Sequence, residues 1–415
     1  MIQHFLHLFI RRTHFWRTVS ISEMAELYSS RMLRVMAMQM MGGFGIVYLY
    51  QLGYGVQWLA WYYVIYFGSR FLMSPLVAIT VARYGPKHGT LISNLLFVLA
   101  ASLMALVPVW GIVALILLVP IGGFSRSLYD VCYLVDFSKV KHIEHSGKEL
   151  GIMQIIERVM TALGPILGGL VALFFGPIIM MIVAAVLMLG SALPLFFTSE
   201  PVKIHQKLTL KHFNLKVAWK PMIAQIAAGI DMNASGLMWN MFIVVVVFGA
   251  VSNSSYLQLG VLSSVALFAS IIISYMYGKL VDSHKGRTLL KFSVIGDSIV
   301  YLLRPFASTP IQVAGINVAN EVVTTGYMLP ATRGIFDTAD GLPGYRIVYI
   351  TAMATMLVVG DTVAMLLLAA LLTFMTDAQA LTNIYFLIAP MLLLIGLHKT
   401  AVYRRGILTR FIHRV

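Results

Sequence analysis

Four carboxyl side chains interrupt otherwise apolar stretches of the sequence: Asp130, Asp231, Glu321 and Asp361. A carboxyl group at such a position can be neutral in one environment and charged in another, so it can take up and release a proton as its surroundings change. We rank Glu321 first, because it lies midway along its apolar stretch and in register with Arg126 of an earlier one. For each of the four alone, a structural ion pair or a capped buried polar group is the alternative interpretation.

Other polar side chains in the apolar stretches could bind a small molecule. Arg126 precedes Asp130 by four residues, so the two share a helical face, and Arg126 is the expected fixed positive charge. Met, Trp and Tyr side chains could line an adaptable pocket for an amphipathic molecule. The predicted pocket residues are Arg126, Glu157, Trp239, Asn240 and Asn320.

The sequence gives no indication of a metal site or of a bound cofactor. The single cysteine, Cys132, cannot form an intramolecular disulfide or a cysteine metal cluster. The sequence contains neither a HExxH motif nor a glycine-rich phosphate loop ending in Lys-Ser or Lys-Thr, and its histidines lack metal-ligand spacing. We therefore expect no metal, no cofactor, no ATP-driven step and no enzymatic activity.

The composition indicates that lipid surrounds most of the chain. Hydrophobic residues make up 59% of 415 residues, charged residues make up 11%, and the mean hydropathy is +0.86. Soluble domains carry about 25% charged residues, and a spanning helix needs roughly 20 apolar ones. Lipid cannot form hydrogen bonds with backbone N–H and C=O groups, and a helix satisfies these groups internally. We therefore predict an all-α membrane protein. The twelve predicted spans are 32–52, 57–80, 88–108, 110–135, 150–174, 177–198, 224–250, 256–280, 288–306, 309–331, 346–374 and 380–398.

Positive charge predicts the orientation of the chain. Arg70, Arg126, Arg158 and Arg304 lie within spans or at their outer edge, whereas the other Lys and Arg are assigned to the N-terminal arm, alternate loops and the tail. By the positive-inside rule both termini are cytoplasmic. We expect a multi-pass protein of the cell (inner) membrane. We attribute the net charge of +14 to the orientation of the chain in the membrane and to contact with membrane lipids. No nucleic-acid partner is expected.

A basic segment after the sixth span divides the chain into two halves. We expect an N-terminal arm with an interfacial amphipathic helix (1–31), a six-helix bundle (32–198), a cytoplasmic linker (199–221), a second six-helix bundle (222–400) and a basic cytoplasmic tail (401–415). The loop "AITVARYGPKHGTLI" after span 2 corresponds to "GKLVDSHKGRTLL" after span 8. Such an internal repeat is typical of transporters whose halves meet at a midplane site.

The loop after span 8 resembles a signature of the major facilitator superfamily, Gly-x-Leu-x-Asp followed by Gly-Arg, with one extra residue before its Gly-Arg. The matching residues are Gly278, Leu280, Asp282, Gly286 and Arg287. The first-half copy keeps Arg83 and Gly85, but alanine stands where the family has its Gly and Asp. An aspartate facing the N-terminal end of a neighbouring helix would form a latch that favours the state closed to the cytoplasm. A solvated turn that anchors the span ends is the alternative.

A second segment, "GPILGG" in span 5, is similar to the fifth-helix motif common in the antiporters of this family. Gly164 and Gly168 lie four residues apart, as do Pro165 and Gly169, so each pair shares a helical face. Small residues allow close helix packing and the proline kinks the helix. Close packing without any role in antiport is the alternative interpretation.

The resemblance implies a secondary active transporter that works by alternating access, with spans 1, 4, 7 and 10 around a central cavity and Asp297 of span 9 outside it. It also implies that a monomer suffices. We expect proton-coupled export (antiport) of an amphipathic or drug-like compound, with proton-coupled uptake (symport) of a polar nutrient or metabolite as the alternative. A non-transporting membrane protein would need a large soluble domain or a catalytic cluster, and the sequence contains neither.

Overall fold

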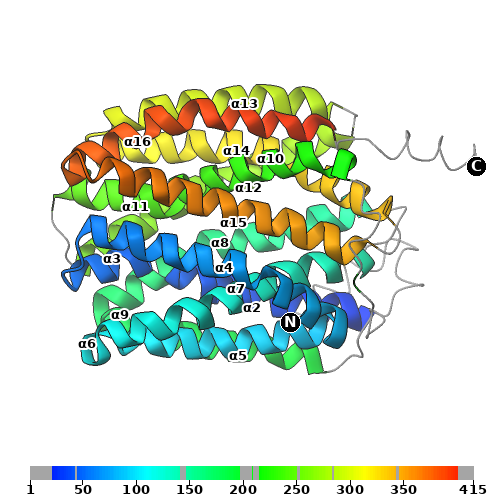
Figure 1. Ribbon diagram of the computed structural model, residues 1–415, viewed down its shortest axis with the longest axis horizontal. Coiled ribbons are helices and arrows are strands. Elements are labelled where there is room, and N and C mark those ends of the chain that lie inside the picture. The colour runs from blue at the N-terminus through cyan, green and yellow to red at the C-terminus, as the bar shows by residue number, and fades with distance from the viewer. Residues whose placement is uncertain are drawn as a thin grey trace, which may run out of the picture.

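The computed structural model of this protein is a bundle of long helices that run roughly side by side (Figure 1). The structure describes residues 21–42, 44–140, 146–196, 208, 215–249, 253–282, 285–342 and 345–400. Within these ranges the regular elements are all helices, which confirms the all-α fold class. The predicted helix of the arm before residue 21, most of the linker and the tail after residue 400 lie outside the described residues.

Among the described residues, the N-terminal half contains six successive helical segments. These are α2 (Ile21–Met41) with α3 (Phe44–Gln51), α4 (Val56–Tyr84), α5 (Pro86–Ala105) with α6 (Val107–Trp110), α7 (Ile112–Val140), α8 (Ser146–Phe175), and α9 (Pro177–Ala192) with the 3₁₀ turn η2 (Leu193–Phe196).

The described part of the C-terminal half contains six more. They are α10 (Leu215–Asn233) with η3 (Ala234–Met238), α11 (Trp239–Phe242) and η4 (Ile243–Phe248), then α12 (Asn253–Asp282), α13 (Gly286–Leu303) with η5 (Arg304–Phe306), α14 (Pro310–Asp340), α15 (Arg346–Leu371), and α16 (Asp377–Leu392) with η6 (Leu393–Thr400). The elements η3 and η4 are π-helical. Helix α10 begins inside the segment assigned to the linker.

Turn residues determine where several helices stop. Gly85 separates α4 from α5 with a φ of 86°, its amide donates to the carbonyl of Val81, and Pro86 begins the next helix. A positive φ favours glycine because a side chain would clash there. Thr309 before α14 and Thr376 before α16 each form a capping box with the glutamine three residues later. The sequence therefore specifies these boundaries locally.

The outside of the bundle is apolar, as a lipid environment requires. Leu72, Ile311 and Phe374 are 75%, 84% and 87% exposed. Among the described residues, eight helices are long and apolar enough to cross a membrane, and two shorter apolar helices lie in α8 and α9. Helices α13 and α14 pack against each other and complete the twelve segments.

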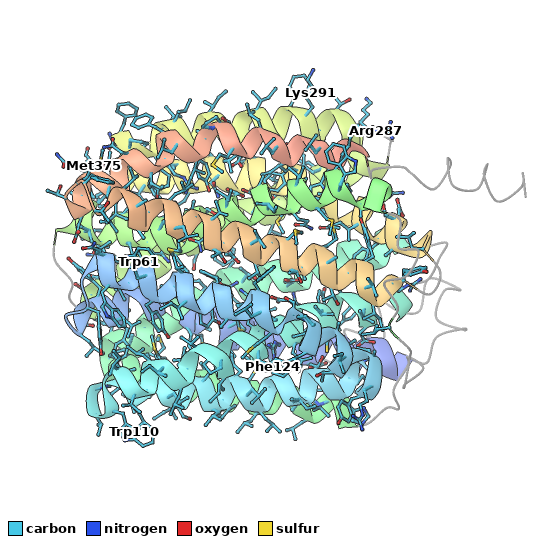
Figure 2. All side chains as sticks on the ribbon, viewed as in Figure 1. Trp61, Trp110, Phe124, Arg287, Lys291 and Met375 are labelled. Atoms are coloured by element: carbon cyan, nitrogen blue, oxygen red, sulfur yellow. The ribbon has the colours of Figure 1, made fainter. Side chains whose placement is uncertain are left out.

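The two ends of the bundle differ in charge. Lys220 in the first turns of α10, Arg287 near the start of α13 and Arg346 at the start of α15 lie at one end, which we call the basic end. Figure 2 shows Arg287 toward this end and Trp61, Trp110 and Met375 at the other. Aromatic side chains near helix ends and a one-sided distribution of Lys and Arg are both typical of membrane proteins.

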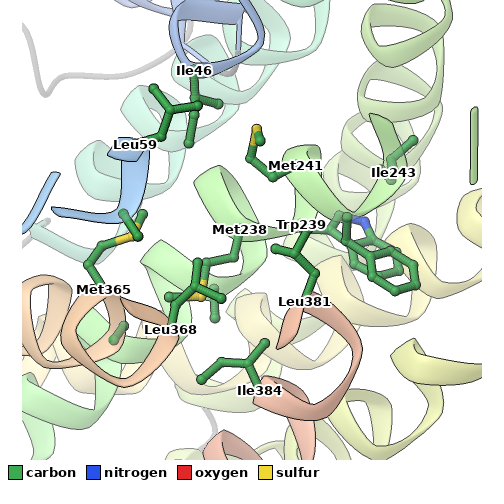
Figure 3. Packing of buried hydrophobic residues seen from close by; sticks show 14 of the residues in the cluster. Ile46, Leu59, Met238, Trp239, Met241, Ile243, Met365, Leu368, Leu381 and Ile384 are labelled. Atoms are coloured by element: carbon green, nitrogen blue, oxygen red, sulfur yellow. The ribbon is translucent and has the colours of Figure 1, made fainter. Parts of the chain in front are cut away.

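Helices of each half pack mainly with one another, and the halves meet through α4 with α15 and through α8 with α12. At the end opposite the basic end, a buried apolar cluster joins Ile46 and Leu59 of the first half to Met238, Met365 and Leu368 of the second (Figure 3). Toward the basic end, a second cluster joins Val77 and Val131 to Ile350 and Met353. Apolar side chains therefore fill both ends of the contact between the halves.

Candidate functional site

Three helices bring charged side chains together between these two apolar clusters. Arg70 lies at the middle of α4, Arg126 and Asp130 lie near the middle of α7, and Asp361 lies in the central part of α15. The first three belong to the N-terminal half and Asp361 to the C-terminal half. The site therefore sits at the contact between the halves, at the depth of the apolar spans.

Arg70 is the centre of this group. Its Nη2 lies 3.1 Å from Asp130 Oδ2, and its Nη1 lies 3.8 Å from Asp361 Oδ2. Its Nε donates a hydrogen bond of 3.1 Å to Ser127 Oγ. Arg126 Nε reaches the same oxygen of Asp130 at 3.2 Å. We call Arg70, Arg126, Asp130 and Asp361 the interface ion-pair network.

The network balances two guanidinium groups against two carboxyl groups. Arg70 and Asp361 are buried, whereas Asp130 and Arg126 are partly exposed. Ion pairs taken out of water gain little net stability, because their attraction is offset by the lost hydration. Breaking one such pair by removing a partner is nevertheless costly. The arrangement is therefore sensitive to the charge of a single carboxyl group.

A small cavity adjoins the network between α4, α7 and α15. It is lined by Arg70, Ser74, Ser127, Asp130 and Thr355, together with apolar side chains. The enclosed space has room for about one water molecule, whereas a drug-sized ligand needs roughly 300–1,000 Å³. In this conformation the halves would have to move apart to admit an organic molecule.

The C-terminal half encloses a second polar cluster. Asp231 on α10 accepts a hydrogen bond of 2.6 Å from the hydroxyl of Tyr301 and another from the hydroxyl of Tyr327. Arg304 donates to the carbonyl of Ala234 at 3.0 Å and to Asn320 Oδ1 at 2.6 Å. Its guanidinium lies over the ring of Tyr301. This cluster is buried, and no hydrogen bond or ion pair among the described residues joins it to the interface ion-pair network.

The N-terminal half holds a third cluster around α2. Arg31 pairs with Glu157 at 2.6 Å and lies over the ring of Tyr133. Arg34 is buried, donates to Asn94 and lies over the ring of Tyr129. Arg34 lies within the predicted span 32–52, although the charge pattern counted it with the N-terminal arm, and the structure places it inside α2.

The structure brings together some predicted site residues and separates others. Arg126 and Asp130 meet as their spacing indicated, and Asp361 joins them across the interface. Asp231 lies in the separate C-terminal cluster, which Asn320 also joins. Glu157 pairs with Arg31 of α2, which also donates to the hydroxyl of Tyr129 beside Asp130. The half-buried Glu321 follows Asn320 on α14.

Trp239 is packed inside the apolar cluster. Its ring stacks on Phe242 at 5.0 Å, and its Nε1 donates to Asn317 Oδ1 at 2.6 Å. Asn240 beside it is half-buried. Contact of Trp239 and Asn240 with a substrate therefore stays a prediction that requires the halves to open.

The glycines of span 5 lie where two neighbouring helices come closest. A Cβ atom added to Gly164 or Gly168 would meet Gln39 or Met40 of α2. One added to Gly169 would lie 2.8 Å from the carbonyl oxygen of Tyr256 on α12, and Pro165 faces Gly260 of that helix. One face of the motif thus packs against α2 of the same half, and the other face packs against α12 of the other half.

The repeated loops lie at the basic end. Gly278 and Asp282 belong to the last turns of α12, Gly286 begins α13, and Arg287 follows it. Arg83 at the end of α4 is exposed and lies over the ring of Tyr84. The side chain of Asp282 lies outside the described part of the structure, so the latch stays a prediction.

Sequence reasoning left several buried charged residues out of the site, among them Arg34, Arg70, Asp297 and Arg304. The available signal was the presence of an ionisable side chain within an apolar span, which by itself indicates function. Asp297 was set aside because span 9 was expected outside the cavity. Among the described residues, no group of three or more His, Cys, Asp and Glu could hold a metal ion.

A long-helix membrane bundle with its charged side chains at the contact of two halves has the architecture of a membrane transporter. The sequence profile of the Major Facilitator Superfamily matches residues 27–336. The chain belongs to this superfamily, whose members are transporters and not enzymes.

Several relatives have names that refer to export. The chain is 25% identical over 253 residues to the "Multi-drug resistance efflux pump PmrA homolog" of Lactococcus lactis, covering 58% of this chain and 62% of that protein. It is also 25% identical over 300 residues to "Multi-drug resistance efflux pump PmrA" of Streptococcus pneumoniae, covering 70% and 74%. The match thus spans less than two thirds of the length of the first relative.

Solved structures of transporters share the fold. The Escherichia coli fucose:proton symporter FucP has a TM-score of 0.61 at 13% identity and covers 91% of this chain and 98% of its own. The nucleoside transporter NupG has a TM-score of 0.66 at 10% identity, covering 92% and 99%. These likenesses confirm the fold.

Proposed function

We propose that this transporter exports an amphipathic or drug-like compound in exchange for protons. The observation that carries the proposal is the interface ion-pair network, in which Arg70 of one half lies between Asp130 of the same half and Asp361 of the other. The names of the efflux-pump relatives support export as the direction. The alternative, proton-coupled uptake of a polar nutrient or metabolite, is separated from it by the test below.

The network suggests how a proton could be coupled to movement of the halves. Because Arg70 and Asp361 belong to different halves, separating α4 from α15 must break their contact. Protonation of Asp361 removes its negative charge, so the attraction that opposes separation is lost while Arg70 keeps Asp130. A proton that enters from outside and leaves to the cytoplasm would then drive the opposite movement of the substrate.

The substrate would bind where the halves open. The methionines and aromatic side chains around Trp239 provide an adaptable apolar surface, and Arg126 provides a positive charge that is partly exposed. The two apolar clusters join the halves at opposite ends of the bundle. Each would come apart in turn, so that the site opens first to one side of the membrane and then to the other. We further propose that the basic end faces the cytoplasm, that the membrane is the cell (inner) membrane and that a monomer suffices.

Accumulation of lipophilic dyes in cells that lack their own efflux pumps tests the proposal. Cells expressing the protein should accumulate less dye than cells with an empty vector. This difference should vanish when an ionophore collapses the proton gradient and when Asp361→Asn replaces the parent. A matched control is Asp377→Asn, because Asp377 is an exposed carboxyl group at the start of α16.

The outcomes separate the two directions of transport. Lower dye accumulation that depends on the proton gradient supports export. Higher accumulation with the parent protein would indicate uptake and overturn the antiport proposal. An export activity that persists in Asp361→Asn and without a proton gradient would remove the network from the coupling step.

A further inference from the structure

Asp297 is a carboxyl group buried inside the C-terminal half. It lies on α13, its side chain is 0% exposed, and neither carboxylate oxygen accepts a hydrogen bond from any residue that the structure describes. An ionised carboxylate without donors is strongly destabilised in an apolar interior. A protonated carboxyl group has no charge and avoids this cost.

The charged neighbours of Asp297 determine the net charge of its surroundings. Asp231 on α10 and Arg304 at the end of α13 are the charged groups that act on it, and Tyr301 and Tyr327 lie within range of its field. All of these side chains are buried. Two ionised carboxylates and one guanidinium would leave an uncompensated negative charge inside the protein.

Hydrogen bonds decide which of the two carboxyl groups is the charged one. Asp231 accepts from the hydroxyls of both Tyr301 and Tyr327, and such donors stabilise its ionised form. Asp297 has no donor among the described residues. The positive charge of Arg304 acts on Asp231, and the guanidinium donates hydrogen bonds to Ala234 and Asn320.

We propose that Asp297 is a proton-binding site of the C-terminal half, neutral beside the ionised pair of Asp231 and Arg304. The site takes one proton and no metal ion, since the described residues provide no group of three metal-binding side chains. It is distinct from the interface ion-pair network, and it holds whether the transporter exports or imports. Its position inside one half means that its proton affinity depends on the distance between α13 and α10, which the hydrogen bond from Tyr301 to Asp231 bridges.

The path of α10 gives this dependence a structural basis. The helix changes from α to π at Ala234, three residues after Asp231. Wide π turns break the regular hydrogen-bond ladder and occur frequently at functional sites. Arg304 on η5 binds the carbonyl of Ala234 at this transition. A shift of α10 would therefore change the separation of Asp231 and Asp297, and with it the repulsion that keeps Asp297 protonated.

Infrared spectroscopy of the purified protein in lipid tests the site without any transport assay. At neutral pH the parent should show the carbonyl-stretch band of a buried protonated carboxyl group, and Asp297→Asn should lose it. Asp377→Asn, which alters an exposed carboxyl group, should keep the band. An unchanged band in Asp297→Asn would overturn the proposal. So would a band that appears in the parent only after sodium is replaced by choline, because the site would then hold a cation.

Thermal unfolding provides the second measurement. An amide matches a protonated carboxyl group in shape and charge, so Asp297→Asn should unfold within about 2 °C of the parent. Asp231→Asn should unfold at a clearly lower temperature, because it leaves Arg304 without its negative partner. An Asp297→Asn protein that fails to assemble, or that is destabilised as much as Asp231→Asn, contradicts the proposal. A negative dye-efflux result would leave it standing, because neither measurement involves transport.

Discussion

Arg70 of α4 and Asp361 of α15 form an ion pair across the two halves, with Nη1 and Oδ2 3.8 Å apart. The same guanidinium holds Asp130 on its own half at 3.1 Å. Arg70 is thus paired both with Asp130, which moves with it as part of the same half, and with Asp361, which belongs to the other half. This division makes the contact between the halves responsive to the protonation of Asp361.

Paired substitutions measure this contact. Arg70→Gln should destabilise the protein by about 3–5 kcal/mol, since it leaves buried carboxyl charge without its partner. In the double variant Arg70→Gln with Asp361→Asn, the loss should be smaller than the sum of the two single losses by about 0.5–3 kcal/mol. Unfolding of the purified proteins in detergent gives the four free energies. Additive losses would mean that the two side chains do not interact.

Two glycines should respond to alanine with opposite signs. Gly169→Ala should cost about 1–3 kcal/mol, because its Cβ would lie 2.8 Å from the backbone of Tyr256 and would push α8 from α12. Gly315→Ala on α14 should gain about 0.5–1 kcal/mol, because nothing lies within 4 Å of the added atom and alanine favours a helix. Thermal unfolding compares both with the parent. A neutral Gly169→Ala would show that the halves are loosely packed here.

Asp282→Asn tests the predicted latch at the basic end. Loss of one contact between a charge and a helix end, about 0.3–2 kcal/mol, should shift the population toward the cytoplasm-open state about twofold to thirtyfold. The measurement is thiol labelling of Tyr84→Cys, an exposed position beside Gly85, in a Cys132→Ala background. Equal labelling with and without Asp282→Asn would remove the latch interpretation.

Glu321→Gln tests the carboxyl group that we ranked first from the sequence. Proton-driven movement of the substrate should be abolished while substrate binding persists, because the amide keeps the shape but cannot exchange a proton. Transport into everted vesicles, measured at several pH values, checks the first part, and dye-binding fluorescence checks the second. Transport with the pH dependence of the parent would exclude Glu321 from coupling and leave Asp361 as the main candidate.

The site was predictable in part from the sequence. The spacing of Arg126 and Asp130 indicated their contact, because residues four apart on a helix are neighbours whatever surrounds them. The same rule assigned Gly164 and Gly168 to one face and Pro165 and Gly169 to the other. In contrast, the pairing of Arg70 with Asp361 and of Glu157 with Arg31 joins residues far apart in the chain. Charge alone could not say which of several buried arginines each carboxyl group would meet.

The sequence by itself determined the lipid environment, the helical class, the succession of helices, the basic end and the superfamily. These properties depend on composition and on patterns within about 20 residues, so no knowledge of packing is needed. The tertiary structure decided that Arg70 links the halves and that Asp297 is buried without a hydrogen-bond donor among the described residues. Such relationships depend on how each helix is rotated against its neighbours, and close side-chain packing over the whole bundle fixes that rotation.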